Sequence, residues 1–157
     1  MATNSAVSSA RGGDKRPVAY VTRVEKFSAC HRLHSYESIN TQKNVFFEPG
    51  ADPEGAKGHY NIEVTVRGPV DSTTGMVINI TDLKDIINIA VMDKMDHKHL
   101  DLDVPDFRDS TLVSTTENVA VVIYEGIKGH LPSHVNLYEV KIHETDKNIV
   151  IYRGEYE

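Results

Sequence analysis

The stretch Tyr60-Asn-Ile-Glu-Val-Thr-Val-Arg67 decides the class of fold, because apolar and polar residues alternate along it without a break. Successive side chains of a β-strand point to opposite faces of a sheet, so this strand has one apolar and one polar face. The apolar face carries Tyr60, Ile62, Val64 and Val66. A strand of this kind is typical of an antiparallel sheet that is covered on one side only.

Further strands are predicted on both sides of this stretch. Residues Val18 to Leu33 alternate loosely and predict a first strand. Residues Leu137 to Glu144 and Ile149 to Arg153 predict two more, joined by the turn Thr145-Asp-Lys-Asn148. Between the first two strands, Asn40 to Gly58 is rich in proline and glycine and predicts a long loop.

Two helices are predicted between the two pairs of strands. Thr81 is the expected N-cap of the first helix, whose apolar stripe runs from Leu83 to Val91. The second helix opens with the capping-box pattern Ser114-Thr-Thr-Glu117 and ends near Gly129. The order ββααββ predicts an α+β domain, in which an antiparallel four-stranded sheet carries two helices packed on one face.

Composition narrows the class of protein. The chain has 157 residues, a formal net charge of −6 and a single cysteine, Cys30. The negative charge argues against a nucleic-acid or acidic-membrane partner, and no apolar run approaches the ~20 residues of a membrane span. One cysteine excludes a disulfide framework and favours a cytoplasmic location. Residues 1–16 are small and polar and predict a disordered tail before a single domain over residues 17–157.

Two acidic positions are candidates for chemistry. Strand parity places Glu144 with Tyr138, Val140 and Ile142 on an apolar face, where an unpaired carboxylate is costly. Glu144 therefore either binds a ligand with paired N–H donors at the mouth of a pocket, or follows the end of the strand and meets solvent. The pair Asp96-His97 either forms an acid–base group or belongs to a solvated polar loop.

Histidine and cysteine near the first two strands are candidates for metal binding or nucleophilic chemistry. His31 follows the first strand and His59 opens the second, and imidazole nitrogen is a common metal ligand. Cys30 is either a nucleophile or a small buried thiol. His130, His134 and His143 show no grouping typical of metal ligands, and we interpret them as surface residues.

These motifs together resemble the 6-pyruvoyl-tetrahydropterin synthase family. The resemblance extends from about residue 18 to the C-terminus. It rests on several long blocks of sequence, which are Phe27-Ser-Ala-Cys-His-Arg-Leu33, Thr74-Gly-Met-Val77, Thr81-Asp-Leu-Lys84, Asp96-His-Lys-His-Leu-Asp101, Leu102-Asp-Val-Pro105, Val113-Ser-Thr-Thr-Glu-Asn-Val-Ala120 and Glu144-Thr-Asp-Lys-Asn-Ile149.

The resemblance implies a tunnel fold and a homohexamer, a dimer of trimers with active sites between subunits. It implies conversion of 7,8-dihydroneopterin triphosphate to 6-pyruvoyl-tetrahydropterin and triphosphate, a step toward tetrahydrobiopterin. Zinc held by three histidines polarises the substrate, and a cysteine with an Asp-His pair moves protons. By position, Glu144 becomes the pterin anchor, Asp96 and His97 the proton relay, and His31 a zinc ligand. Thr115 and Thr116 then line the pterin pocket.

One segment departs from the family pattern. Where the family reads F-G-K-C-N-N-P-N-G-H-G-H-N-Y, this chain reads Phe47-Glu-Pro-Gly-Ala-Asp-Pro-Glu-Gly-Ala-Lys-Gly-His-Tyr60. The cysteine position holds Gly50, and two zinc-ligand positions hold Ala56 and Gly58. His59 falls on the asparagine position. A shift of one residue would make His59 a ligand, but it would place Lys57, a cation, at the other ligand position.

An incomplete ligand set and a missing nucleophile predict weak or absent zinc binding and severely reduced or absent lyase activity. Glu48, Asp52 or Glu54 could replace the cysteine as a base. The alternative is a non-catalytic member that binds a pterin small molecule or only builds the oligomer. A related synthase acting toward deazapurines would share the fold, but it would also need the missing cysteine and zinc.

Overall fold

The computed structural model describes residues 15–31 and 56–157, with side chains in the second segment described from His59 onward. The predictions for Gly50, for the possible bases near it, for most of the N-terminal tail and for residues 40–55 lie outside these residues. Within them, no helix is long and apolar enough to cross a membrane.

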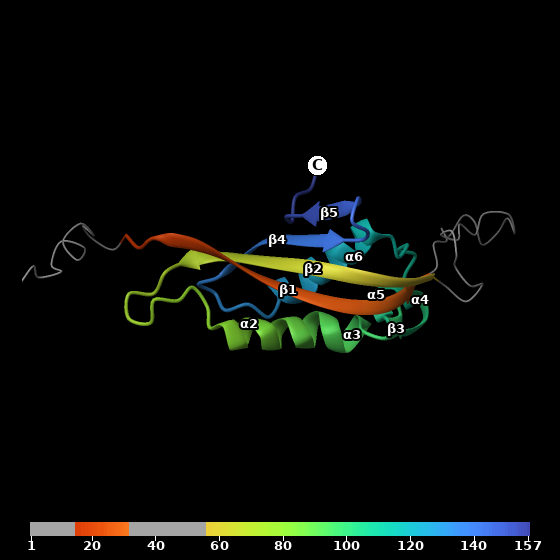
Figure 1. Cartoon of the computed structure of the whole chain (residues 1–157), viewed down its shortest axis with the longest axis horizontal. Coiled ribbons are helices and arrows are strands. Elements are labelled where there is room, and N and C mark those ends of the chain that lie inside the picture. The colour runs from red at the N-terminus through yellow and green to blue at the C-terminus, as the bar shows by residue number, and fades with distance from the viewer. Residues whose placement is uncertain (1–14, 32–55) are drawn as a thin grey trace, which may run out of the picture.

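Five strands form one sheet in the order β3-β1-β2-β4-β5 (Figure 1). The four predicted strands are β1 (Val18–His31), β2 (Ala56–Pro69), β4 (Asn136–His143) and β5 (Ile149–Tyr152), each antiparallel to its neighbour. The fifth, β3 (Lys98–His99), was not predicted and pairs with β1 in parallel. The predicted loop was too long at its end, because β2 begins at Ala56 and pairs with His31.

The first helical segment is continuous and has three parts, α2 (Ile80–Ile87), η1 (Asn88–Met92) and α3 (Asp93–Met95). Thr81 is not its N-cap: the side chain of Asn79 accepts a hydrogen bond from the Thr81 backbone N–H at 2.8 Å, which starts the helix at Ile80. Two short helices, α4 (Leu100–Asp103) and α5 (Pro105–Arg108), come later in the chain than this segment.

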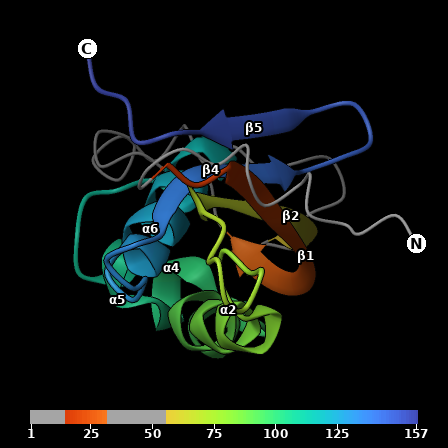
Figure 2. The same cartoon turned by 90° about the vertical axis from the view of Figure 1, so that its left-hand side faces the viewer.

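The second predicted helix is α6 (Thr116–Lys128). Its N-cap is Thr115, one residue after the start of the capping-box pattern, and the Thr115 hydroxyl accepts from the Asn118 backbone N–H at 3.3 Å. Ser114 instead donates its hydroxyl to Asp101 at 3.0 Å. Figure 2 shows α2 and α6 on the same side of the sheet, as the order of elements predicts.

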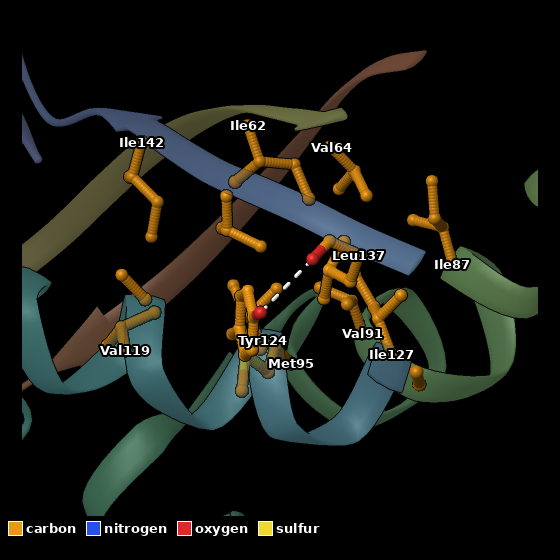
Figure 3. Close-up of a cluster of buried hydrophobic side chains, with 14 of the residues drawn as sticks. Ile62, Val64, Ile87, Val91, Met95, Val119, Tyr124, Ile127, Leu137 and Ile142 are labelled. Carbon is orange, nitrogen blue, oxygen red and sulfur yellow. Dashed lines mark hydrogen bonds between the residues drawn. The ribbon is translucent and has the colours of Figure 1, made fainter. Parts of the chain in front are cut away.

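A hydrophobic core fills the space between the sheet and these helices (Figure 3). The apolar face predicted for β2 is confirmed, since Tyr60, Ile62, Val64 and Val66 are all buried. Tyr124 of α6 reaches the sheet and donates its hydroxyl to the Leu137 carbonyl at 3.1 Å. Burial raises the pKa of the Tyr124 hydroxyl, with a smaller contribution from the Glu125 carboxylate.

A β-bulge changes the predicted faces of β4. Thr65 pairs with Glu139 whereas Val66 pairs with Leu137, so Tyr138 is an extra residue in the ladder. The prediction that Tyr138 shares the apolar face was therefore wrong: Leu137, not Tyr138, is buried beside Val140 and Ile142. Tyr138 is 38% exposed and packs edge-on against Tyr20.

Candidate functional site

A cavity of about 690 Å³ lies where β1, β2 and the end of β4 meet the segment after α3. Polar residues dominate its lining, which includes Lys26 and Ser28 from β1, His59 from β2, the pair 96–97 and residues 143–146. The structure thus brings Glu144 to the same cavity as the pair Asp96-His97, from which it is far apart in the sequence.

Glu144 is held at this cavity by the turn between β4 and β5. Its backbone N–H donates to the Asn148 carbonyl at 3.1 Å, and the Thr145 hydroxyl accepts from the N–H groups of Lys147 and Asn148. The strand ends at His143, so Glu144 is outside the ladder, but its side chain is half-buried and lines the cavity. Glu144 therefore follows the end of the strand and also lies at a cavity, while ligand binding by its carboxylate stays a prediction.

Asp96 and His97 are fixed to the backbone of β1. Asp96 Oδ1 accepts a hydrogen bond from the Ser28 N–H at 3.0 Å, and the His97 N–H donates to the Ser28 carbonyl at 2.7 Å. His97 has a φ of 58°, in the left-handed region that histidine adopts more readily than most residues. Its Nε2 lies 3.8 Å from Asp96 Oδ2, and its side chain is 83% exposed. The segment is therefore an ordered part of the cavity wall.

Two histidines of the cavity form contacts that the sequence did not reveal. The Ser28 hydroxyl and His59 Nδ1 are 2.8 Å apart, across the paired positions of β1 and β2. His143, interpreted from the sequence as a surface residue, is half-buried, lines the cavity and contacts the Glu63 carboxylate at 2.5 Å. Glu63 and His143 lie on the polar faces of their predicted strands, but no sequence signal joins the members of either pair.

His31 lies on the other face of the same two strands. It is 4% exposed, and its Nδ1 is 2.6 Å from the Tyr60 hydroxyl. Its Nε2 is buried and has no hydrogen-bond partner among the described residues. Because His31 pairs with Ala56 while His59 pairs with Ser28, the register places the two histidines on opposite faces, and the structure does not bring them together.

Comparison with known proteins identifies the family. The family model for 6-pyruvoyl tetrahydropterin synthase matches residues 20–155. The chain belongs to this family. It is similar to the 6-pyruvoyl tetrahydrobiopterin synthase of Poecilia reticulata, with 51% identity over 88% of this chain and 92% of that protein. The human protein of the same name is 47% identical over 94% of this chain and 99% of its own length.

Solved structures agree with this assignment. The 6-pyruvoyl tetrahydropterin synthase of Caenorhabditis elegans superposes with a TM-score of 0.75 at 39% identity, covering 89% of this chain and 98% of that one. The Plasmodium vivax enzyme shares the fold, with a TM-score of 0.62 at 17% identity over 87% of this chain and 97% of that one. The predicted tunnel fold and the family resemblance are both confirmed.

Of the three positions that the family resemblance assigns to zinc ligands, this chain has a metal-binding side chain at one, His31. The register pairs His31 with Ala56 and Ala29 with Gly58, which places positions 31, 56 and 58 on one face at neighbouring rungs. His31 suits a zinc ligand, since its Nδ1 is hydrogen-bonded and its Nε2 has no partner among the described residues. Alanine and glycine have no side-chain donor atom. No group of three or more His, Cys, Asp or Glu in residues 15–31 and 59–157 is placed to hold a metal ion.

Thr115 and Thr116 are not among the described residues that line the cavity. Both lie at the start of α6, where Thr115 is the N-cap and Thr116 is 3% exposed. Cys30 is half-buried and is also not among the lining residues. Within one chain, the cavity therefore contains the predicted anchor and relay residues but not the predicted threonines.

Proposed function

We propose that this chain is a pterin-binding member of the 6-pyruvoyl tetrahydropterin synthase family whose triphosphate-eliminating activity is severely reduced or absent. The observation that carries the proposal is the register of β1 and β2. Positions 31, 56 and 58, which the family resemblance assigns to zinc ligands, share one face in this register, and only His31 has a side chain that can bind a metal. Catalytic zinc is normally held by about three protein ligands.

Pterin binding is supported by the position of Glu144. A carboxylate can accept two parallel N–H bonds, and the amino and ring N–H groups of a pterin offer two donors side by side. Glu144 is half-buried at a cavity of about 690 Å³, within the range of pockets that hold small molecules. We assign it as the pterin anchor.

Asp96 and His97 are the acid–base pair of the same cavity, but they lack their partners. In the family a cysteine and zinc act beside such a pair, and the aligned positions here hold Gly50, Ala56 and Gly58. A positioned acid–base group contributes about 10²–10⁴-fold to a rate. Absence of the cysteine alone is therefore expected to lower turnover greatly. His31 by itself does not supply the polarising metal.

We further propose that the chain assembles as the cytoplasmic homohexamer of the family, a dimer of trimers, with a pterin small molecule as its partner and without nucleic acid or membrane. An oligomer-building subunit that binds no pterin is the second candidate. The same absence of zinc-binding side chains favours this second candidate. It differs from the first because Glu144 then has no role in pterin binding.

The test combines three measurements on the purified full chain: zinc per chain without added metal, turnover of 7,8-dihydroneopterin triphosphate, and calorimetric binding of 7,8-dihydroneopterin. We expect little zinc, little turnover, and binding that Glu144→Gln weakens by about 100-fold, because two charge-assisted hydrogen bonds are lost. Glu155→Gln, which removes an exposed carboxylate outside the lining, is the matched control.

Each outcome decides a part of the proposal. Chelator-sensitive turnover with stoichiometric zinc would show a working lyase and overturn the loss of activity. Unchanged affinity in Glu144→Gln, with an unchanged circular dichroism spectrum, would overturn the role of Glu144. No binding of any pterin by a hexameric chain would favour the oligomer-building subunit.

A further inference from the structure

The described part of the cavity lining has a charge that is unusual for a site expected to accept a triphosphate. Among the described lining residues, the carboxylates are those of Asp96, Glu144 and Asp146, and the single lysine or arginine is Lys26. Counting histidine as neutral, the described lining is therefore net negative, like the chain as a whole. A ligand that carries several negative charges is repelled by such a surface.

The same cavity contains neutral groups suited to hydroxyls. The Ser28 hydroxyl and His59 Nδ1 are 2.8 Å apart, so each fixes the orientation of the other. Hydroxyl and imidazole groups both donate and accept hydrogen bonds, which matches the two-way bonding of an alcohol. Since Nδ1 is used by Ser28, Nε2 is the nitrogen of His59 that a ligand would contact.

Ser28 also joins this pair to the acid–base segment. Its N–H donates to Asp96 Oδ1 at 3.0 Å, and its carbonyl accepts from the His97 N–H at 2.7 Å. One strand residue thus fixes, through its backbone and side chain, three polar residues of the cavity wall. Glu144 lies in the same cavity. The side chain of a pterin whose ring is bound by Glu144 would therefore be close to the prearranged Ser28–His59 pair.

We propose that this cavity selects a pterin with a free polyhydroxy side chain over the same pterin carrying a triphosphate, with Ser28 and His59 as the hydroxyl contacts. The proposal rests on the pterin binding proposed above and narrows it to a ligand class. It makes Asp146, on the turn beside Glu144, a residue that disfavours phosphate.

Three pterins separate the contributions: 7,8-dihydropterin, which has no side chain, 7,8-dihydroneopterin, and its triphosphate. We expect the full chain to bind 7,8-dihydroneopterin about tenfold or more tightly than the triphosphate at low ionic strength. Because salt screens charge repulsion, this ratio shrinks as salt is added.

Two variants assign the effect to residues. Asp146→Asn removes one carboxylate and is expected to lower the preference for 7,8-dihydroneopterin over its triphosphate about threefold. Asp85→Asn makes an equal change of charge at an exposed position of α2 outside the lining, and it should leave this preference unchanged. Ser28→Ala weakens 7,8-dihydroneopterin about threefold to tenfold and leaves 7,8-dihydropterin unchanged, since only the former has hydroxyls to bind.

Contrary results are distinguishable from failure of the proposed function. Binding of the triphosphate as tightly as 7,8-dihydroneopterin overturns the inference and leaves pterin binding in place. An equal effect of Ser28→Ala on both unphosphorylated pterins overturns the hydroxyl contact. A chain that binds none of the three overturns the proposed function, and this inference with it.

Discussion

The two faces of the β1–β2 ladder differ sharply at the end near the cavity. On the helix side, His31 is buried with its Nδ1 bonded to Tyr60, and the paired positions opposite it and next to it hold Ala56 and Gly58. On the opposite side, Ser28 and His59 form a hydrogen bond of similar length in a polar cavity. Both faces are built from the same backbone.

The difference teaches that the two faces of one strand pair can carry unlike sets of side chains, because successive residues of a strand point to opposite faces. In this register, positions 56 and 58 lie on the opposite face from positions 28 and 59. The backbone pairing of β1 and β2 extends as far as His31 and Ala56.

The strongest way to break the comparison is to return the ligands to the helix-side face. We expect Ala56→His with Gly58→His to raise zinc from little or none to about one ion per chain, because three histidines on one face complete a zinc ligand set. Elemental analysis measures the ratio. Addition of His31→Ala to the double variant is expected to abolish the gain, and a double variant without zinc would contradict the retained geometry.

The buried hydrogen bond on the helix-side face is the next test. Tyr60→Phe removes the hydroxyl that pairs with His31 Nδ1 and leaves that nitrogen without this bond. We expect a loss of about 1–3 kcal/mol in the free energy of unfolding, measured by urea denaturation. Replacing His31 with leucine in the same chain should recover part of the loss. A change below about 0.5 kcal/mol would show that water or another group satisfies His31.

The matching change on the cavity side sharpens the contrast. His59→Asn removes the imidazole that pairs with the Ser28 hydroxyl, at a site where the histidine is exposed. Water can replace an exposed partner, so we expect the free energy of unfolding to change by less than about 0.5 kcal/mol. The same urea measurement checks it. A loss as large as that of Tyr60→Phe would mean that this pair supports the fold rather than a ligand.

Local patterns in the sequence predicted most of the fold. The alternation in Tyr60–Arg67 and the stripe from Leu83 to Val91 each follow from the period of one element, and the structure confirms both faces. The predicted and observed N-caps differ by one or two residues, because several nearby side chains can cap a helix and tertiary packing selects one.

The rest depends on pairing between distant strands. Tyr138 was placed on the wrong face because a bulge depends on its partner strand, which the sequence of β4 does not specify. Glu144 and Asp96 were candidates from the residues alone, and the family resemblance gave them roles, whereas the Ser28–His59 contact required the register that joins positions 28 and 59. Neither residue is unusual by itself, so no local signal marks the pair.

The far end of the same strand pair provides the smallest effect and a control that involves neither face of the site. After β2, Asp71 Oδ1 accepts hydrogen bonds from the N–H groups of Thr73 and Thr74, each at 2.8 Å. These bonds, with Arg16 nearby, lower the pKa of the Asp71 carboxyl below its ordinary value of 3.8.

A carboxyl with a lowered pKa in the folded state stabilises the fold above its ordinary pKa, and this contribution is lost as the pH falls through the lowered value. We expect Asp71→Asn to be less stable than the parent chain at pH 7, and we expect this difference to close as the pH falls through the lowered pKa, since protonation then removes the same charge. Urea denaturation of both chains at several pH values measures the gap, and a gap that widens in acid would contradict the assigned direction. Pterin binding at pH 7 should be unchanged in this variant, because the turn lies outside the cavity lining.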